Sequence, residues 1–181
     1  MVGLLGLRGR AFAGLVGLML SGQQIFEEGI VSPREPAAIQ PASVDLTLSG
    51  DWFYRLRPSL VNVARHRPDY DWDPSLMLKP GEFALAATEE WVDIPPEFVG
   101  RVEGKSTLAR MGLIVHTTAG FIDPGFHGKI TLELCNVGPC TLVLEPGMYI
   151  CQLSVARMER VDGVYKGKYQ DAMGVEGAKL A

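Results

Sequence analysis

The chain has 181 residues, of which 17 are Lys or Arg and 21 are Asp or Glu, so its formal net charge is −4. This length suits a single domain, and 47% hydrophobic with 21% charged residues is typical of a globular protein rather than a disordered one. The acidic balance excludes a nucleic-acid binder that works through a broad basic surface. Any phosphate group must therefore meet a few placed cations, backbone N–H groups or a metal ion.

The first twenty residues are apolar, but Arg8 and Arg10 interrupt them and leave only Ala11 to Leu20 unbroken. That run covers about half of a membrane span, and a signal peptide carries its charges ahead of the apolar stretch. We therefore interpret residues 1–18 as an N-terminal extension outside the fold, with Met19 as the start of the domain. No membrane association is expected.

Three cysteines and three histidines are scattered along the chain without a CxxC, HxxxH or HxE pairing. These spacings disfavour a disulfide framework and a protein-built zinc site. We expect the thiols to lie in the core of a cytoplasmic protein.

From Met19 onward the expected elements are short. Ser21 is suited to cap a helix that runs toward Gly29, and the prolines of residues 31–42 indicate an extended or looped segment. The turns KPGE, DPGF and EPGM follow, in which Pro sets φ and Gly allows a positive φ. Between these turns lie seven β-rich runs: Val44–Leu48, Trp52–Leu56, Phe83–Thr88, Phe98–Glu103, Lys129–Cys135, Thr141–Leu144 and Tyr149–Met158.

Many short strands at this spacing predict an all-β sandwich or barrel, here over residues 19–160. Residues 61–74 are charged and are expected to form a long excursion between strands. Residues 161–181 have no apolar period, so we expect a flexible C-terminal tail.

One segment breaks the β pattern. Residues 105–112 combine good helix formers with a Ser/Thr start and a Gly stop, which predicts a helix of one or two turns. Lys105, Ser106 and Arg110 allow two interpretations. They are either a helix cap with two solvated cations or an anion site made of free N–H groups and adjacent basic side chains.

Glu133 lies in a run whose alternation places Ile130, Leu132 and Leu134 on one face and Lys129, Thr131 and Glu133 on the other. By spacing alone, this polar face is best explained as a solvated one. The functional alternative is a carboxylate fixed on a rigid strand for acid/base work.

Three further polar residues allow two interpretations each. Asp123 precedes Pro124-Gly125, either as a turn opener or as a ligand contact. Asp45 and Gln152 interrupt apolar strands, where a polar side chain needs hydrogen bonds. Gln152 is suited either to read a base edge or to satisfy a neighbouring backbone group.

The order of three segments identifies the family. QPASVDLTL, VEGKSTLARMGLIVHTTAGFIDPGFHGKITLEL and PGMYICQLS together resemble the dCTP deaminase branch of the dUTPase-like superfamily, over Met19 to Met158. The resemblance implies a distorted β-barrel or jelly-roll with one or two short helices. It also implies a homotrimer with active sites between subunits, and deamination of dCTP to dUTP without zinc.

The resemblance also assigns chemistry to residues. Glu133 is the implied general acid/base, which moves a proton from water to cytosine N3 and the departing amine while the water attacks C4. Ser106 and the backbone carbonyl near Ala119 would hold the water, and Arg110 would orient Glu133.

Nucleotide contacts follow from the same resemblance. The triphosphate would meet residues 105–110, with Mg²⁺ carried mainly by the phosphates, and Asp123 would contact the deoxyribose 3′-hydroxyl. dCTP and dUTP are the implied substrates, and dTTP is an implied inhibitor. The complete implied nucleotide-binding set is Lys105, Ser106, Thr107, Arg110, Ala119, Asp123, Thr131, Glu133, Gln152, Tyr165 and Lys168.

The stretch His116 to Asp123 is similar to the bifunctional members, which continue from dUTP to dUMP and pyrophosphate. The tail departs from the family pattern, because Ala172 stands where a Gln is usual and the spacing from Tyr165 to Lys168 is short. The alternatives are a dUTPase-only enzyme, which has no use for an acid/base beside C4, and a non-catalytic nucleotide-binding β-barrel.

Overall fold

The structure is a computed structural model that describes residues 19–51, 53–59, 61–65, 67–75 and 77–180. The expected extension of residues 1–18 and the expected strand start at Trp52 lie outside these ranges. Among the described residues, no helix is long and apolar enough to cross a membrane. The elements in chain order are α1 (Gly22–Glu27), β1 (Val31–Ser32), a 3-10 turn (Pro36–Ala38), β2 (Val44–Thr47), β3 (Phe53–Leu56), β4 (Tyr70–Asp73), β5 (Met77–Leu78), β6 (Phe83–Asp93), β7 (Phe98–Gly104), α2 (Ser106–Arg110), β8 (Leu113–Ile114), β9 (Phe121–Ile122), β10 (His127–Asn136), β11 (Leu142–Val143) and β12 (Tyr149–Arg157).

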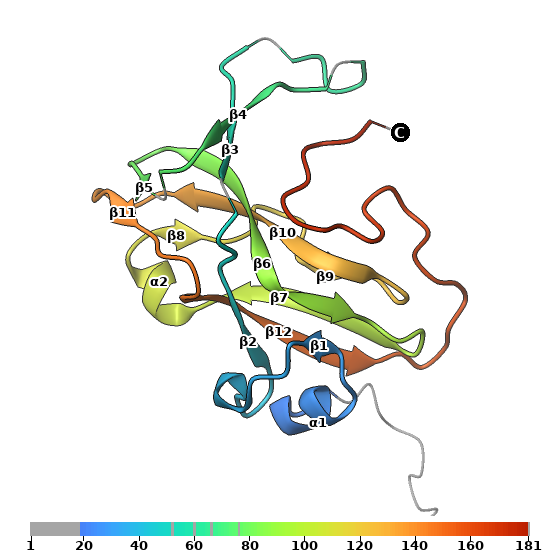
Figure 1. Cartoon of the computed structure of the whole chain (residues 1–181). Coiled ribbons are helices and arrows are strands. Elements are labelled where there is room, and N and C mark those ends of the chain that lie inside the picture. The colour runs from blue at the N-terminus through green and yellow to red at the C-terminus, as the bar shows by residue number, and fades with distance from the viewer. Residues whose placement is uncertain (1–18, 52, 60, 66, 76, 181) are drawn as a thin grey trace, which may run out of the picture.

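Two antiparallel sheets form the body of the molecule (Figure 1). One has the order β4-β3-β6-β10-β8, with β1 also paired to β6, and the other has the order β2-β12-β7-β9. A separate β5–β11 pair lies at the same end as α2. The strands and the two short helices confirm the expected all-β fold. The sheets are strongly distorted and do not close into a complete barrel.

Strand β10 shows how the sequence pattern builds the core. Its residues alternate between half-buried and buried along all ten positions, as the period of two predicted. Leu132 and Leu134 are at most 1% exposed and face the second sheet's apolar side chains. Each such leucine contributes about 1.5–3 kcal/mol of burial free energy. The same alternation leaves Thr131 and Glu133 on the opposite face, on a strand that packing holds rigid.

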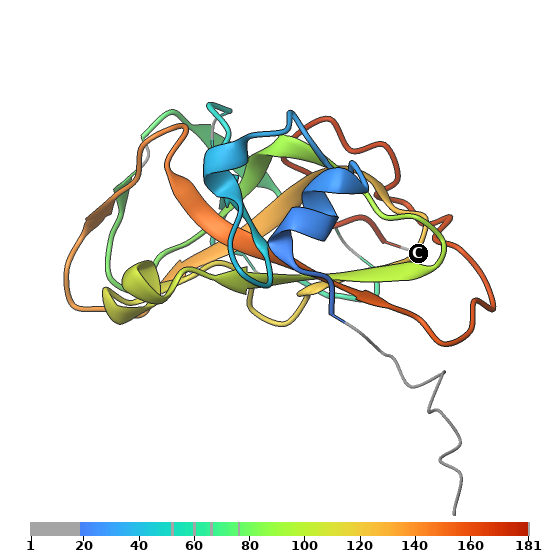
Figure 2. The ribbon, with the colours of Figure 1, turned by 90° about the horizontal axis from the view of Figure 1, so that it is seen from below.

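The cap predicted at Ser21 and the three turn signals are confirmed, whereas α2 begins after Lys105 without the Ser/Thr side-chain cap that the sequence predicted. Ser21 caps α1 through a capping box with Gln24, and α1 lies beside β2 (Figure 2). The glycines of the KPGE, DPGF and EPGM turns all have φ near +80°. The excursion expected over residues 61–74 was wrong at its end, because Tyr70–Asp73 forms β4. Ion pairs of Arg55 with Asp73 and of Arg57 with Asp71 join β4 to β3.

Candidate active site

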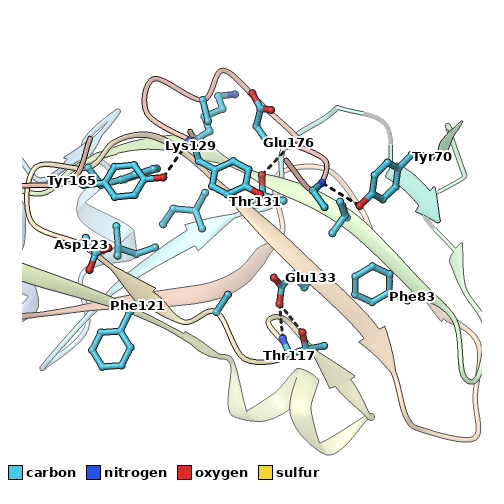
Figure 3. A pocket seen from close by; sticks show the side chains of 18 residues that line it. Tyr70, Phe83, Thr117, Phe121, Asp123, Lys129, Thr131, Glu133, Tyr165 and Glu176 are labelled. Atoms are coloured by element: carbon cyan, nitrogen blue, oxygen red, sulfur yellow. Dashed lines mark hydrogen bonds between the residues drawn. The ribbon is translucent and has the colours of Figure 1, made fainter. Parts of the chain in front are cut away.

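A cavity of about 440 Å³ opens between β10, the segment that follows β8, the start of β9 and the C-terminal tail (Figure 3). Five residues of the implied nucleotide-binding set line it together with other side chains. These five are Ala119, Asp123, Thr131, Glu133 and Tyr165. Sequence positions as far apart as 119 and 165 therefore meet at one hollow, which a local pattern alone does not reveal.

Glu133 is held in this cavity by one neighbouring segment. Its Oε2 accepts hydrogen bonds from Thr117 N–H at 2.9 Å and from Thr117 Oγ1 at 2.7 Å. The Glu133 backbone N–H donates to Val115 O at 3.0 Å. Both the backbone and the carboxylate of Glu133 are thus fixed by residues 115–117, and the second carboxylate oxygen points away from Thr117 (Figure 3). Thr117 was not identified from the sequence, where no local pattern links it to Glu133.

Asp123 stands at the cavity rim because of the DPGF turn. Phe126 N–H donates to Asp123 O at 3.1 Å, and Gly125 has a φ of +80°. Tyr165 joins this turn from the tail, since its N–H donates to Pro124 O at 2.6 Å and its ring lies 5.8 Å from that of Phe126. The turn therefore carries a carboxylate into the site and anchors the beginning of the tail.

The tail itself lies across the cavity. Ala172 forms a parallel bridge with Gly128, and Lys129 N–H donates to Ala172 O at 2.8 Å. Ala172 is 4% exposed, so it is packed against β10 rather than directed to solvent. The Lys168 ammonium donates to Lys179 O within the tail and does not line the cavity.

The structure does not bring α2 into the same cavity. Lys105, Ser106, Thr107 and Arg110 are absent from its lining, and the three helical residues among them are exposed. In Figures 1 and 2, α2 lies at the end of the molecule opposite the tail. Within one chain, the implied acid/base and the implied phosphate-binding segment are therefore separate.

A buried polar network lies directly behind the beginning of α2. Asp45 is 2% exposed, and its Oδ2 accepts from Gln40 Nε2 at 3.0 Å and from the Lys105 ammonium. Gln152 donates to Gly104 O at 3.2 Å and accepts from Ser43 Oγ at 3.0 Å. The half-buried Gln152 amide thus has its hydrogen bonds and is absent from the cavity lining, whereas buried Asp45 is satisfied at Oδ2 only, since its Oδ1 has no partner among the described residues.

Within the described ranges, no three His, Cys, Asp or Glu side chains gather as a metal site.

Comparison with known proteins decides the family. Residues 19–158 match the sequence model of the dCTP deaminase-like family. The chain belongs to this family.

Individual dCTP deaminase relatives agree with that assignment. The chain is 40% identical over 161 residues to "dCTP deaminase, dUMP-forming" of Pseudarthrobacter chlorophenolicus, covering 80% of this chain and 83% of that protein. It is 42% identical over 160 residues to the protein of the same name from Acidothermus cellulolyticus, with coverages of 80% and 83%. It is 38% identical over 157 residues to "dCTP deaminase" of Natronomonas pharaonis, with coverages of 78% and 80%.

A solved structure supports the fold. The 2′-deoxycytidine 5′-triphosphate deaminase of Agrobacterium tumefaciens superposes with a TM-score of 0.59 at 18% identity. The match covers 77% of this chain and 48% of that chain, so the present chain spans about half the length of the solved one. At this identity the likeness supports the shared β architecture alone.

Proposed function

We propose that this chain hydrolyses dCTP to dUTP and ammonia, and then hydrolyses dUTP to dUMP and pyrophosphate. The observation that carries the proposal is Glu133, a carboxylate fixed by two hydrogen bonds on a rigid strand in a cavity of nucleotide-binding size. Membership of the dCTP deaminase-like family and relatives named as dUMP-forming support the same reaction.

In the first step, Glu133 takes a proton from a water molecule as that water attacks C4 of cytosine. Glu133 passes this proton to N3, then takes the proton of the new C4 hydroxyl and gives it to the amino group. The C4–N bond breaks, ammonia leaves, and the C4=O group of uracil forms. One water is consumed and one ammonia is released. The Ala119 carbonyl and Ser106 would hold the attacking water, and Arg110 would orient Glu133.

We infer that Ser106 and Arg110 reach this cavity from a second copy of the chain. They lie on α2, outside the cavity that their own chain forms around Glu133. A homotrimer with its sites between subunits would bring the two parts together, with Tyr165 and Lys168 of the tail closing over the nucleotide.

The triphosphate would be bound by Lys105, Ser106, Thr107 and Arg110, and Asp123 would contact the deoxyribose 3′-hydroxyl. Mg²⁺ would arrive with the triphosphate, whose oxygens are its preferred ligands. We derive no step through a protein-bound metal. dTTP shares the deoxyribose and the triphosphate of the substrate and would compete for the same contacts.

The test is incubation of the chain with dCTP and Mg²⁺, with chromatographic separation of dCTP, dUTP and dUMP and an ammonia assay. We expect ammonia and dUMP in equal amounts. Accumulation of dUTP alone would reject the second step. Conversion of added dUTP without any reaction of dCTP would identify a dUTPase-only enzyme. No conversion of either would favour a non-catalytic nucleotide-binding protein.

A further inference from the structure

Tyr70 is a cavity residue that no local sequence pattern marks. It begins β4 and reaches from the β3–β4 hairpin to the cavity wall (Figure 3). Its hydroxyl accepts a hydrogen bond from Ala178 N–H at 3.2 Å. Its ring lies against Gly177, where an added Cβ would come within 2.9 Å of the Tyr70 Cε2 atom. Tyr70 therefore holds two consecutive tail residues, one through its hydroxyl and one by close packing that glycine permits.

The tail residue that precedes these contacts touches β10. Glu176 N–H donates to Thr131 Oγ1 at 3.0 Å. Tyr54 lies in β3 of the same hairpin. Its pKa is raised by its own burial and by the Glu176 carboxylate, so the charge of Glu176 also acts on the hairpin. Residues 176–178 thus bridge β10 and the β3–β4 hairpin across the cavity.

A threonine hydroxyl has one proton to donate and two lone pairs that accept. Where Glu176 N–H occupies one lone pair of Thr131 Oγ1, the hydroxyl proton turns away from the tail. It is then free to be donated to an acceptor in the cavity, such as a carbonyl or ring nitrogen of a pyrimidine. The direction in which the Thr131 hydroxyl donates its hydrogen bond consequently depends on the position of residues 176–178.

We propose that Tyr70 is a positioning residue for the substrate: it fixes the tail over the cavity and, through Glu176, sets the hydrogen-bonding state of Thr131. Chain ends fray unless they are tied down, and on the cavity wall Tyr70 binds Ala178 while Tyr169 accepts from the N–H of the next residue, Lys179, at 3.1 Å. The effect on the reaction rests on the proposed function, whereas the attachment of the tail does not.

The experiment compares Tyr70→Phe with Tyr54→Phe, the same change in the same hairpin at a ring that does not line the cavity. Hydrogen–deuterium exchange of the peptide covering residues 174–180 is measured without nucleotide, followed by kcat and KM for dCTP. Loss of one hydrogen bond predicts about fivefold faster exchange in Tyr70→Phe. KM should rise several-fold with kcat nearly unchanged, because the tail binds substrate and transition state alike. Tyr54→Phe should match the wild type in each measurement at neutral pH, because the raised pKa of Tyr54 keeps its phenol uncharged beside Glu176.

Gly177→Ala gives a second, independent perturbation, because its Cβ would push the tail from the Tyr70 ring. Unchanged exchange in both Tyr70→Phe and Gly177→Ala would overturn the attachment. Faster exchange with an unchanged KM would overturn the positioning role. If the wild type fails to convert dCTP, the proposed function falls, while the exchange measurements still decide whether Tyr70 holds the tail.

Discussion

Thr117 gives the sharpest test of how the carboxylate is held. Thr117→Val keeps the shape of the side chain and removes the hydroxyl that donates to Glu133 Oε2 at 2.7 Å, while the 2.9 Å bond from the backbone N–H remains. A hydrogen bond to a charged group contributes about 1.5–3 kcal/mol, and the exposure of Thr117 places this one at the lower end. A loss of about 1.4 kcal/mol corresponds to a tenfold lower rate.

We expect kcat for dCTP deamination to fall about tenfold in Thr117→Val, with a much smaller change in KM, since Thr117 acts through Glu133. The assay is steady-state ammonia release with saturating dCTP. Thr117→Ser keeps the donor and should retain most of the rate. Thr118→Val changes the adjacent exposed threonine, which does not line the cavity, and should be close to wild type. A Thr117→Val enzyme with wild-type kcat would refute the reasoning.

Three further predictions concern the acid/base, a buried ion pair and the thiols. Glu133→Gln should abolish ammonia release while dCTP still binds in calorimetry; normal turnover would reject Glu133 as the acid/base. Asp45→Ala leaves Lys105 unpaired and should lower the free energy of unfolding in urea by about 2–4 kcal/mol, and no change would show that the pair is not stabilising. The expectation that the thiols lie in the core was wrong for Cys140, which is exposed, whereas Cys151 is buried. Burial raises the pKa of the Cys151 thiol, so a thiol reagent at pH 8 should label Cys140 and spare Cys151 until the chain unfolds. Because this pKa is raised on folding, the associated stability is fully present below about pH 8.5 and should decline as the pH rises above that value, where the unfolded thiol ionises.

Much of the fold follows from local sequence. The alternation in β10, the Ser21 cap and the three Pro-Gly turns each act over a few residues, and each predicted the observed element. Strand β4 was not predicted, because it is an edge strand without an alternating apolar pattern. Its stability comes from β3, through cross-strand pairing and ion pairs that no local pattern displays.

The candidate site was predictable only in part for the same reason. Glu133 and Asp123 were named as site residues through the family resemblance, because strand alternation alone favoured a solvated face for Glu133 and the turn alone explained Asp123. Thr117 and Tyr70 were missed because their importance lies in contacts with residues 16 and 108 positions away. The separation of α2 from the cavity is likewise a property of the assembled sheets.

In the polar network behind α2, selection for folding stability and selection for substrate binding act on the same side chains. Asp45 and Gln152 are cross-strand neighbours in β2 and β12, and together they hold Gly104 and Lys105, where the phosphate-binding segment of the proposed enzyme begins. Replacing such a network with apolar residues often stabilises a protein. Here the same replacement would release the start of α2, so a lineage that improved its folding in this way would lose substrate affinity. The polar residues inside these strands are therefore expected to persist at a cost in stability.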